Sequence, residues 1–509
     1  MSDAVLRNLA IVAAVSLVAG CSGDDNFDVK SQIGPEPVLP EPTSSLVPDL
    51  KVAEVVGWQE GQTPTVPDGF TVTAYARDLA NPRTVHTLPN GDVLVVQSKA
   101  PPGKPIDRPK DYIRQFIMSL AAGDTGGGKE TNLVTLLRDT NRDGVVDERS
   151  DLLTGLTSPF GIAWHDGTLY VAAADAILSY PYQLGETEIT AEPTILTPLP
   201  GEPINHHWTK DLALGPDGRF LYASVGSNSN AGERGLEAEK GRAAIWQVDI
   251  GTGAARVFAS GIRNPNGLNF HPQTGELWTV VNERDELGPN LVPDYLTSVR
   301  EGGFYGWPWS YYGQHVDPRV HPPRPDLVER AIPPDYALSS HVAALGLAFS
   351  NDSALPEAYR DGAFVGMRGS WNRNAFNGYN VVYIPFADGK PAGPAQDIVT
   401  AFLDGDKARG RPVGLAIDGT GALLVADDAG NTVWRVAAAD GSVTPEPIPT
   451  DRVTAPPAAA APATDAEAGP ADPDQAPASP ALDPAEPPPQ PAIAPAVSPE
   501  DGAPAPTEN

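Results

Sequence analysis

The chain has 509 residues, with 50 Gly and 55 Pro against one Cys, and its formal net charge is −30. This negative charge repels phosphate backbones, so nucleic acid is not an expected partner. A single Cys excludes an intrachain disulfide, a Cys-x-x-Cys-His haem and a cysteine-based zinc site. Short apolar runs punctuated by Gly and Pro favour β-structure over helices.

The N-terminus has the pattern of an export signal. The apolar run at 9–18 is too short to span a bilayer as a mature helix, but it fits a signal-peptide core. Residues 17–21 read LVAGC, which resembles the cleavage box of bacterial lipoproteins. We therefore expect a signal peptide at 1–20, lipidation of Cys21 and a membrane lipid anchor. Ser22 in place of Asp implies the periplasmic side of the outer membrane. The alternative is a plain secretory signal that contains a Cys.

Two polar stretches flank the central part of the chain. Residues 21–64 are Pro-rich and are expected to form a disordered tether and a lead-in. Residues 444–509 are dominated by Ala, Pro, Asp and Glu, with Arg452 as the only basic residue. Such a composition buries too little apolar surface to offset the entropy of ordering, so this tail is expected to be disordered. The folded domain is expected at 65–443.

Within that domain, a turn containing Gly is repeatedly followed by an alternating, β-branched strand. Apolar runs such as NGLNF at 266–270 and VGLAI at 413–417 lead into these turns. Repetition of a four-stranded unit predicts an all-β fold, a six-bladed β-propeller, whose polar strand ends converge on one face. A pair of β-sandwiches is the competing interpretation. The turn-and-strand instances are PNGDVLVVQS from Pro89, HDGTLYVAAAD from His165, PDGRFLYASVGS from Pro216, QTGELWTVVNE from Gln273, RDGAFVGMRGS from Arg360 and GTGALLVADDAG from Gly419.

Four segments carry a family resemblance. They are NHHWTKDLALGPDG from 205, SGIRNPNGLNFHP from 260, NERDELGPN from 282 with EGGFYGWP from 301, and RGRPVGLAIDGTG from 409. Together they resemble the soluble aldose and sorbosone dehydrogenases that use pyrroloquinoline quinone (PQQ), over about 65–440. The resemblance implies PQQ and Ca²⁺ as cofactors, bound on the face where the polar strand ends meet.

The resemblance makes His207 the general base, because it lies eight residues before the Gly-Pro-Asp-Gly turn. A His has a suitable pKa for taking a hydroxyl proton near neutral pH. The alternative is a His that only caps a strand. The resemblance also sets Arg263 and Asn264 against the quinone carbonyls, where a fixed cation stabilises the reduced state. A surface Arg beside a turn Asn is the alternative.

Three further arginines are implied in cofactor binding. Arg409 and Arg411 alternate, so both can point to one side of an extended segment, and guanidinium groups bind carboxylates such as those of PQQ bidentately. A charged strand edge is the alternative. Arg368 stands where the glucose enzymes of the family place a Lys, and it is a candidate replacement for that cation.

Two loops are candidate metal sites. In the first, the resemblance implies that the carbonyls of Gly288 and Pro289 bind the Ca²⁺ beside PQQ, with charge from Asp285, Glu286 and Asp294; a solvated acidic loop is the alternative. The second is an EF-hand-like loop, in which Asp139, Asn141 and Asp143 are candidate Ca²⁺ ligands. Its twelfth position is Ser150 instead of Glu, so a plain acidic turn is the alternative.

These features predict an envelope oxidoreductase acting on an aldose sugar or a sugar-derived, sorbosone-like aldehyde. Reoxidation requires an external electron acceptor, a cytochrome c or a quinone, because the single Cys leaves no haem or cluster of the chain's own. Two alternatives stay open: a non-catalytic propeller that serves as a binding module, and a calcium-dependent hydrolase of the lactonase type.

Overall fold

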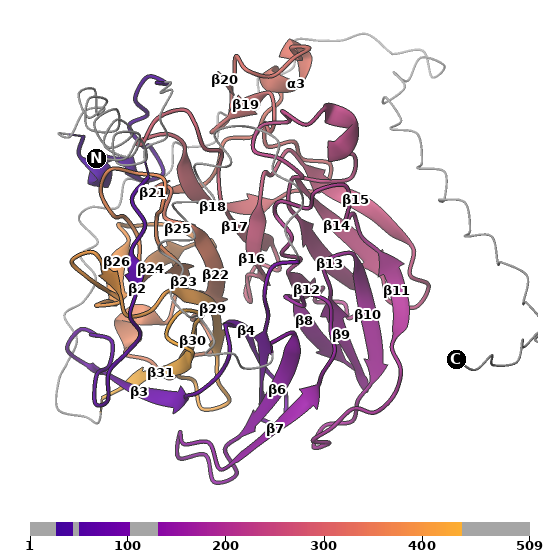
Figure 1. The fold of residues 1–509 in the computed structure, drawn as a ribbon, viewed down its shortest axis with the longest axis vertical. Coiled ribbons are helices and arrows are strands. Elements are labelled where there is room, and N and C mark those ends of the chain that lie inside the picture. The colour runs from indigo at the N-terminus through magenta and orange to yellow at the C-terminus, as the bar shows by residue number, and fades with distance from the viewer. Residues whose placement is uncertain (1–26, 44–49, 102–130, 440–509) are drawn as a thin grey trace, which may run out of the picture. The chain divides into compact units, whose positions relative to one another are not determined.

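The computed structural model describes residues 27–43, 50–101 and 131–439, and almost all of their regular structure is β-strand, as the turn and strand pattern predicts (Figure 1). The predicted signal segment, Cys21 and the tail from 444 onward lie outside the described residues. Helices within these residues are short: η1 (Val29–Gln32), η2 (Leu236–Glu239), α3 (Pro325–Glu329) and η3 (Glu357–Tyr359). Nowhere in the described residues does a helix have the length and apolar character that crossing a membrane requires.

Six sheets of four or five strands make up most of the described structure. The first three are β4 (Pro82–Thr87), β5 (Val93–Gln97), β6 (Leu133–Arg138) and β7 (Glu148–Leu153); β8 (Ile162–His165), β9 (Thr168–Ala172), β10 (Ala176–Pro181) and β11 (Thr194–Pro198); and β12 (Leu212–Leu214), β13 (Phe220–Val225), β14 (Ala244–Asp249) and β15 (Ala255–Ser260).

Two of the other three sheets include a strand from the N-terminal part of the chain. The three sheets are β16 (Pro265–Phe270), β17 (Leu277–Val281), β18 (Pro293–Val299), β21 (Tyr336–Ser340) and β1 (Ile33–Gly34); β22 (Ala344–Phe349), β23 (Gly362–Met367), β24 (Asn380–Ala387), β25 (Lys390–Pro391) and β26 (Gln396–Val399); and β29 (Pro412–Ile417), β30 (Leu423–Asp427), β31 (Thr432–Ala438) and β3 (Phe70–Ala76). Two small sheets pair β19 (Ser310–Tyr311) with β20 (His315–Val316), and β28 (Lys407–Ala408) with both β2 (Glu54–Val55) and β27 (Leu403–Asp404).

The first strand of each large sheet contacts the first strand of the next, from β4 through β8, β12, β16 and β22 to β29 and back to β4 (Figure 1). Glycine permits the closest approaches. A Cβ at Gly346 would lie 2.0 Å from the carbonyl oxygen of Val413, and one at Gly414 would lie 2.5 Å from that of Arg83. The lead-in runs NGLNF and VGLAI form two of these inner strands, and a channel of about 440 Å³ lies between them.

The sequence-predicted turn-and-strand segments all form the second strand of a sheet. Because neighbouring strands are antiparallel, the entry to the first strand, the loop between the second and third, and the exit from the fourth meet at one end. We call this the site end. Its loops include residues 199–211, 226–243, 261–264, 282–292, 368–379 and 400–411. The predicted cofactor and base residues all lie in these loops, whereas the EF-hand-like loop joins β6 to β7 at the opposite end.

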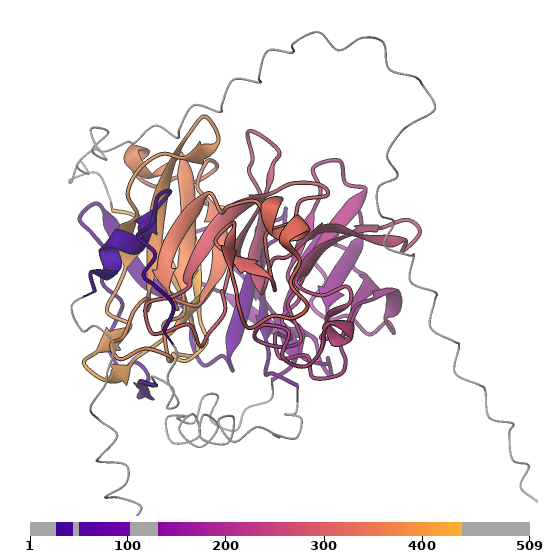
Figure 2. The same ribbon diagram turned by 90° about the horizontal axis from the view of Figure 1, so that it is seen from above.

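The described part of the predicted tether and lead-in, residues 27–43 and 50–64, packs against the rest of the described structure. β1 pairs with β21, so this segment lies against the fourth large sheet (Figure 2). The side chain of Gln32 is buried and donates to the carbonyl oxygen of Asn290, 2.6 Å away. Trp58 stacks edge-on against Trp434. Long-range contacts thus hold residues that have little local preference for order.

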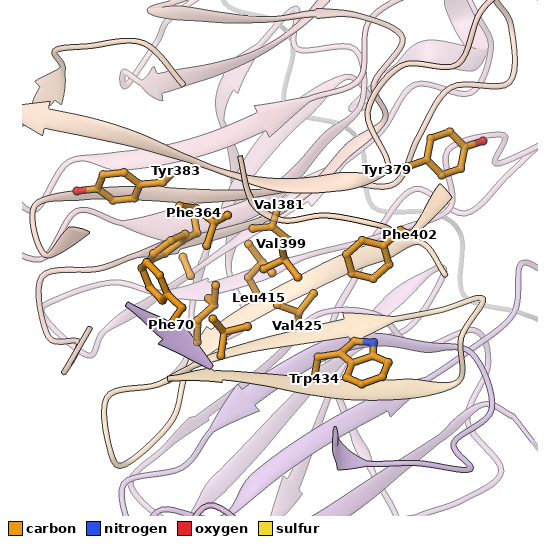
Figure 3. Packing of buried hydrophobic residues seen from close by; sticks show 14 of the residues in the cluster. Phe70, Phe364, Tyr379, Val381, Tyr383, Val399, Phe402, Leu415, Val425 and Trp434 are labelled. Atoms are coloured by element: carbon orange, nitrogen blue, oxygen red, sulfur yellow. The ribbon is translucent and has the colours of Figure 1, made fainter. Parts of the chain in front are cut away.

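The sheet formed by β29, β30 and β31 is completed by β3 from near the other end of the described chain. Residues from this sheet and from the β22–β26 sheet share one apolar cluster, in which Phe70, Phe364, Tyr383 and Trp434 are prominent (Figure 3). Truncating a buried aromatic residue such as Trp434 to Ala costs about 3–5 kcal/mol. Pairing and packing together hold the ends of the domain to each other and keep the site-end loops in place.

Candidate functional site

His207 lies in the loop between β11 and β12, and its ring is oriented by Ser227, which follows β13. Its Nδ1 lies 3.1 Å from the carbonyl oxygen of Ser227 and 2.9 Å from the Oγ. A carbonyl can only accept, and the Ser227 hydroxyl proton is donated to the carbonyl of Ser229 at 2.7 Å. Nδ1 therefore carries the proton, and Nε2 is left with a free lone pair. This is the tautomer that a general base needs.

Burial holds the pKa of His207 well below its usual range, and the positive charge of Arg263 and the neighbouring ring of His206 lower it further. The exposed His206 ring meets the His207 ring edge-on, with the centroids 4.8 Å apart. The close packing needs glycine at 226, because a Cβ there would lie 2.5 Å from the Cβ of His207 and 2.7 Å from the Oδ1 of Asn264. His207 is thus neutral at pH 7 and held tightly against the β13 end.

Arg263 and Asn264 lie near His207. The buried guanidinium of Arg263 donates to the carbonyl oxygens of Asn230 and Glu283 at 3.0 and 2.7 Å, and its Nη2 donates to the Oδ1 of Asn230. Its Nη2 is also 3.6 Å from a carboxylate oxygen of Asp285. Asn264 differs, since its Oδ1 is buried and has no partner among the described residues. Arg263 thus acts as a fixed positive charge that braces the site loops, and its direct contact with a quinone stays a prediction.

A second part of the site is a group of arginines around Asp428, in the loop after β30. Asp428 is buried, and one of its oxygens, Oδ2, accepts from the Nη1 of Arg83 and, at 2.7 Å, from the Nε of Arg368. Arg411 adds a third positive charge and lies beside Tyr379. These charges hold the pKa of the Asp428 carboxyl below its usual range despite its burial. We call Arg83, Arg368 and Arg411 the arginine fan.

The arginine fan carries more positive charge than Asp428 neutralises, and it is not fully hydrogen-bonded. The Nε of Arg83 and the Oδ1 of Asp428 are buried without a partner in the described residues. Arg83 also lies over the rings of Phe160 and Trp208, at 5.7 and 5.8 Å from their centroids. Because Trp208 adjoins His207, the fan and His207 form one continuous site. A flat, negatively charged ligand is the chemistry that this surface suits.

Arg409 and Arg411, which are predicted to bind one ligand together, have different side-chain partners in this structure. The Nη2 of Arg409 donates to the exposed carboxylate of Asp404 at 2.6 Å, whereas Arg411 joins the fan. Residues 409–411 lie in a loop between β28 and β29, and Asp404 on β27 supplies Arg409 with a partner that a local pattern does not reveal. Its role in cofactor binding stays a prediction.

The Gly288–Pro289 loop lies at the same end of the sheets. The Nε2 of His341 is 3.4 Å from the carbonyl oxygen of Gly288, and the Oγ of Ser340 is 3.4 Å from that of Pro289. Both separations exceed an ordinary hydrogen bond of about 2.9 Å. The two carbonyl oxygens are therefore only weakly engaged, and they are the hard donors that Ca²⁺ takes.

The acidic residues of this loop have other partners. Asp294 is buried, accepts from the backbone N–H groups of Glu283 and Ala343 at 2.8 and 2.7 Å, and has a pKa raised to about 7 by its burial. Glu286 is exposed, and Asp285 accepts from the side chain of Asn372 at 2.6 Å. Across the described ranges, no group of three or more His, Cys, Asp or Glu side chains could hold a metal ion by itself. Asp294 therefore serves the loop as a backbone acceptor in this structure.

The EF-hand-like loop is hydrogen-bonded within itself. The carboxylate of Asp139 accepts from the backbone of Gly144 at 2.7 Å, Asn141 accepts from that of Asp143, and Asp143 accepts from Val145. The oxygens predicted to bind Ca²⁺ thus form an Asx-type turn. The turn needs no cation in this form, so its Ca²⁺ site stays a prediction.

Several residues of the site are not predicted from the sequence. Arg83 and Asp428 are 345 residues apart in the chain and meet only in the folded protein. One sequence feature could have indicated Arg83. Asn81-Pro82-Arg83 lies at the start of the inner strand β4, and Arg263-Asn264-Pro265 combines the same three residue types at the start of the inner strand β16. Ser227 and His341 carry no motif.

Comparisons with known proteins agree with the motifs. The model of the family described as Glucose / Sorbosone dehydrogenase matches residues 165–370, and a model described as TrAA12-like matches residues 328–439. An uncharacterized protein of Borreliella burgdorferi is 28% identical over 294 residues, which cover 55% of this chain and 76% of that protein.

A pyrroloquinoline quinone-dependent sugar dehydrogenase of Hypocrea jecorina is 23% identical over 277 residues, which cover 49% of this chain and 57% of that protein, so the match spans little more than half of it. The solved holo form of the pyranose dehydrogenase PQQ domain of Coprinopsis cinerea shares the fold, with a TM-score of 0.58 and 19% identity over 76% of this chain and 100% of that one. The resemblance to the glucose and sorbosone dehydrogenases that the motifs predict is thus confirmed, with the family match itself spanning residues 165–370.

Proposed function

We propose that this chain is a PQQ- and calcium-dependent sugar dehydrogenase, whose six large sheets are the blades of a six-bladed β-propeller. Its substrate is an aldose or a sugar-derived aldehyde of the sorbosone kind. The observation that carries the proposal is the arginine fan beside Trp208 and His207, because it combines an unmatched positive charge, aromatic faces and a base. The PQQ-dependent relative and the PQQ-domain neighbour support the choice of cofactor.

The residues present fit the cofactor. PQQ is flat and carries three carboxylates, and the fan offers three guanidinium groups with the buried Nε of Arg83 still unpartnered. Arg83, Arg368 and Arg411 would bind its carboxylates, and one of the two mutually perpendicular rings of Phe160 and Trp208 would face its plane. When bound, PQQ supplies a hydride acceptor. The carbonyl oxygens of Gly288 and Pro289 would hold the Ca²⁺.

His207 performs the proton transfer. Its Nδ1–H donates to the Ser227 carbonyl, so Nε2 takes the proton from the substrate hydroxyl. The depressed pKa keeps Nε2 unprotonated across the neutral range, and proton removal makes hydride loss from the substrate carbon easier. Arg263 contributes a fixed positive charge near this centre, which favours the negative charge that develops there.

The proposal is tested by reconstitution. The purified chain is loaded with PQQ and Ca²⁺, and dye reduction is followed over a panel of aldoses and aldehydes. We expect saturable cofactor binding and dye reduction with at least one sugar or aldehyde. A chain that binds no PQQ under these conditions would falsify the proposal, and a preference within the panel would define the substrate.

Two further proposals concern the setting of the reaction. An external acceptor, a cytochrome c or a quinone, reoxidises the cofactor, since the single Cys allows neither a Cys-x-x-Cys-His haem nor a cysteine-bound cluster in this chain. Lipidation of Cys21 anchors the chain to the bacterial envelope, facing the periplasm. Metabolic labelling with radioactive palmitate is expected to mark the wild-type chain and not the Cys21→Ala variant; equal labelling of both would exclude Cys21 as the anchor.

A further inference from the structure

Two buried cations clasp the turn that carries His207. The Nζ of Lys210 donates to the Oδ1 of Asn205 and to the carbonyl oxygen of Trp208, each at 3.2 Å. These two acceptors flank the His206–His207 dipeptide. The Nη1 of Arg242 donates to the same Asn205 oxygen at 3.0 Å. Lys210 and Arg242 are 0% and 5% exposed, so the clasp is shielded from solvent.

Arg242 also ties this turn to the end of β13, where the partner of His207 lies. Its Nη1 donates to the carbonyl oxygen of Gly226 at 3.3 Å, and Ser227 follows directly in the chain. On the other side, its Nη2 donates to the carbonyl oxygen of Glu202 at 2.9 Å. One side chain therefore joins the segment before His207 to the strand end that sets its tautomer.

The centre of the clasp, Asn205, has every side-chain group engaged. Its Nδ2 donates to the carbonyl oxygen of Ala174 at 3.1 Å, and its Oδ1 accepts from both cations. Its own N–H donates to the Oδ1 of Asn228 at 2.9 Å. Its φ of 53° lies in the left-handed region, which Asn tolerates better than most residues. Such a fully bonded, left-handed residue fixes the direction in which the chain enters the His207 turn.

The hydrogen bonds that Lys210 and Arg242 donate all end on neutral oxygens, although burying a basic group in its charged form without an ion pair is costly. The charged groups that face Lys210 are Arg242 and Asp175, and Glu239 and Glu202 face Arg242. Burial, with Arg242 as the next cause, holds the pKa of Lys210 well below its usual range. A clasp of this kind is a poor device for stability alone, so its place beside His207 calls for a functional role.

We propose that Lys210 and Arg242 are positioning residues for the base, which keep the His207 ring against Ser227 so that Nδ1 bears the proton and Nε2 is free. This inference rests on the proposed role of His207. Both side chains are buried behind the loop surface, so neither is expected to contact substrate or cofactor. Their effect passes through Asn205, the Trp208 backbone and Gly226.

The test is Lys210→Met, which keeps the length of the side chain and removes its charge and donors, with the exposed Lys240→Met as the matched control. The first readout is the ¹⁵N spectrum of the His207 ring in cofactor-free protein, assigned by its loss in His207→Gln. The second is kcat and KM for sugar oxidation by the PQQ- and Ca²⁺-loaded chain, and the pH profile of kcat/KM.

We expect Lys210→Met to give a mixture of His207 tautomers and a kcat lowered about 10- to 100-fold. A displacement of a catalytic ring by about 1 Å can lower the rate by up to about 100-fold. KM and PQQ affinity are expected to stay within about two-fold, since Lys210 is expected to contact neither ligand. A His207 spectrum and kcat identical to those of wild type would overturn the inference.

Should Lys210→Met not fold, Asn205→Gly replaces it, because glycine accepts the positive φ and removes the shared acceptor. Asn205→Gly is expected to give the same mixture of His207 tautomers, and an unchanged ¹⁵N spectrum of the His207 ring would overturn the inference. The two proposals fail separately. A tautomer shift in a chain whose wild type oxidises no sugar would refute the dehydrogenase and leave the clasp standing.

Discussion

Gly226→Ala tests the geometry of the base most locally. A Cβ at position 226 would lie 2.5 Å from the Cβ of His207, whereas two carbons pack best at about 3.5 Å. His207 or the β13 end must therefore move by about 1 Å. The same methyl would lie 2.7 Å from the Oδ1 of Asn264, so Asn264 blocks part of that movement. A 1 Å shift of a catalytic group lowers the rate about 100-fold.

The assay is dye reduction by the variant loaded with PQQ and Ca²⁺, together with thermal unfolding. We expect kcat to fall about 100-fold with the fold retained. Gly251→Ala is the control, since its nearest neighbour would be 3.5 Å away and its methyl fits without movement. Wild-type kcat in Gly226→Ala would refute the idea that His207 must be held at this position.

Three other substitutions give separable outcomes. Ser227→Ala removes one acceptor of the Nδ1 proton but leaves the carbonyl. The activation free energy is therefore expected to rise by about 1 kcal/mol, which lowers kcat about five-fold, whereas Ser227→Thr is expected to keep the wild-type kcat. Arg368→Met is expected to weaken PQQ binding ten-fold or more by fluorescence titration. Arg256→Met, which breaks an exposed pair with Glu301 and a hydrogen bond to Gln247 away from the site, is expected to leave the affinity unchanged; equal affinities of the two variants would remove Arg368 from the cofactor site. Burial raises the pKa of Asp211 from 3.8 to about 6. Its contribution to the free energy of unfolding is therefore largest below pH 4, and roughly 3 kcal/mol of it is lost as the pH rises to about 6. Urea unfolding at a series of pH values should show this fall for wild type and not for Asp211→Asn, and the same pH dependence in both would contradict the argument.

The strand pattern was predictable because its causes are local. Asn-Gly and Asp-Gly turns fix hairpins, and alternating β-branched residues fix the strand that follows, so all six predicted segments are second strands of a sheet. The position of His207 followed from its distance to such a turn. The shared end of the site loops followed as well, since antiparallel order decides which loops meet.

Contacts between distant parts of the chain were not predictable in the same way. Gln32 reaches Asn290 across 258 residues, so the lead-in folds although its composition suggests a tether. Arg83 joins Asp428 across 345 residues, and Asp404 draws Arg409 away from Arg411. Local spacing sets the direction of a side chain along its own strand. It does not reveal which charge from another sheet stands opposite.

The central claim is that a cofactor on the arginine fan is reduced by a sugar whose proton goes to His207. The most direct measurement is single-turnover reduction of the PQQ-loaded chain by sugar in a stopped-flow spectrometer, for wild type and His207→Ala, with PQQ affinity measured in parallel. We expect equal PQQ affinity and a reduction rate lowered about 10²- to 10⁴-fold in His207→Ala, the usual contribution of a general base. Reduction of His207→Ala at the wild-type rate would contradict the account.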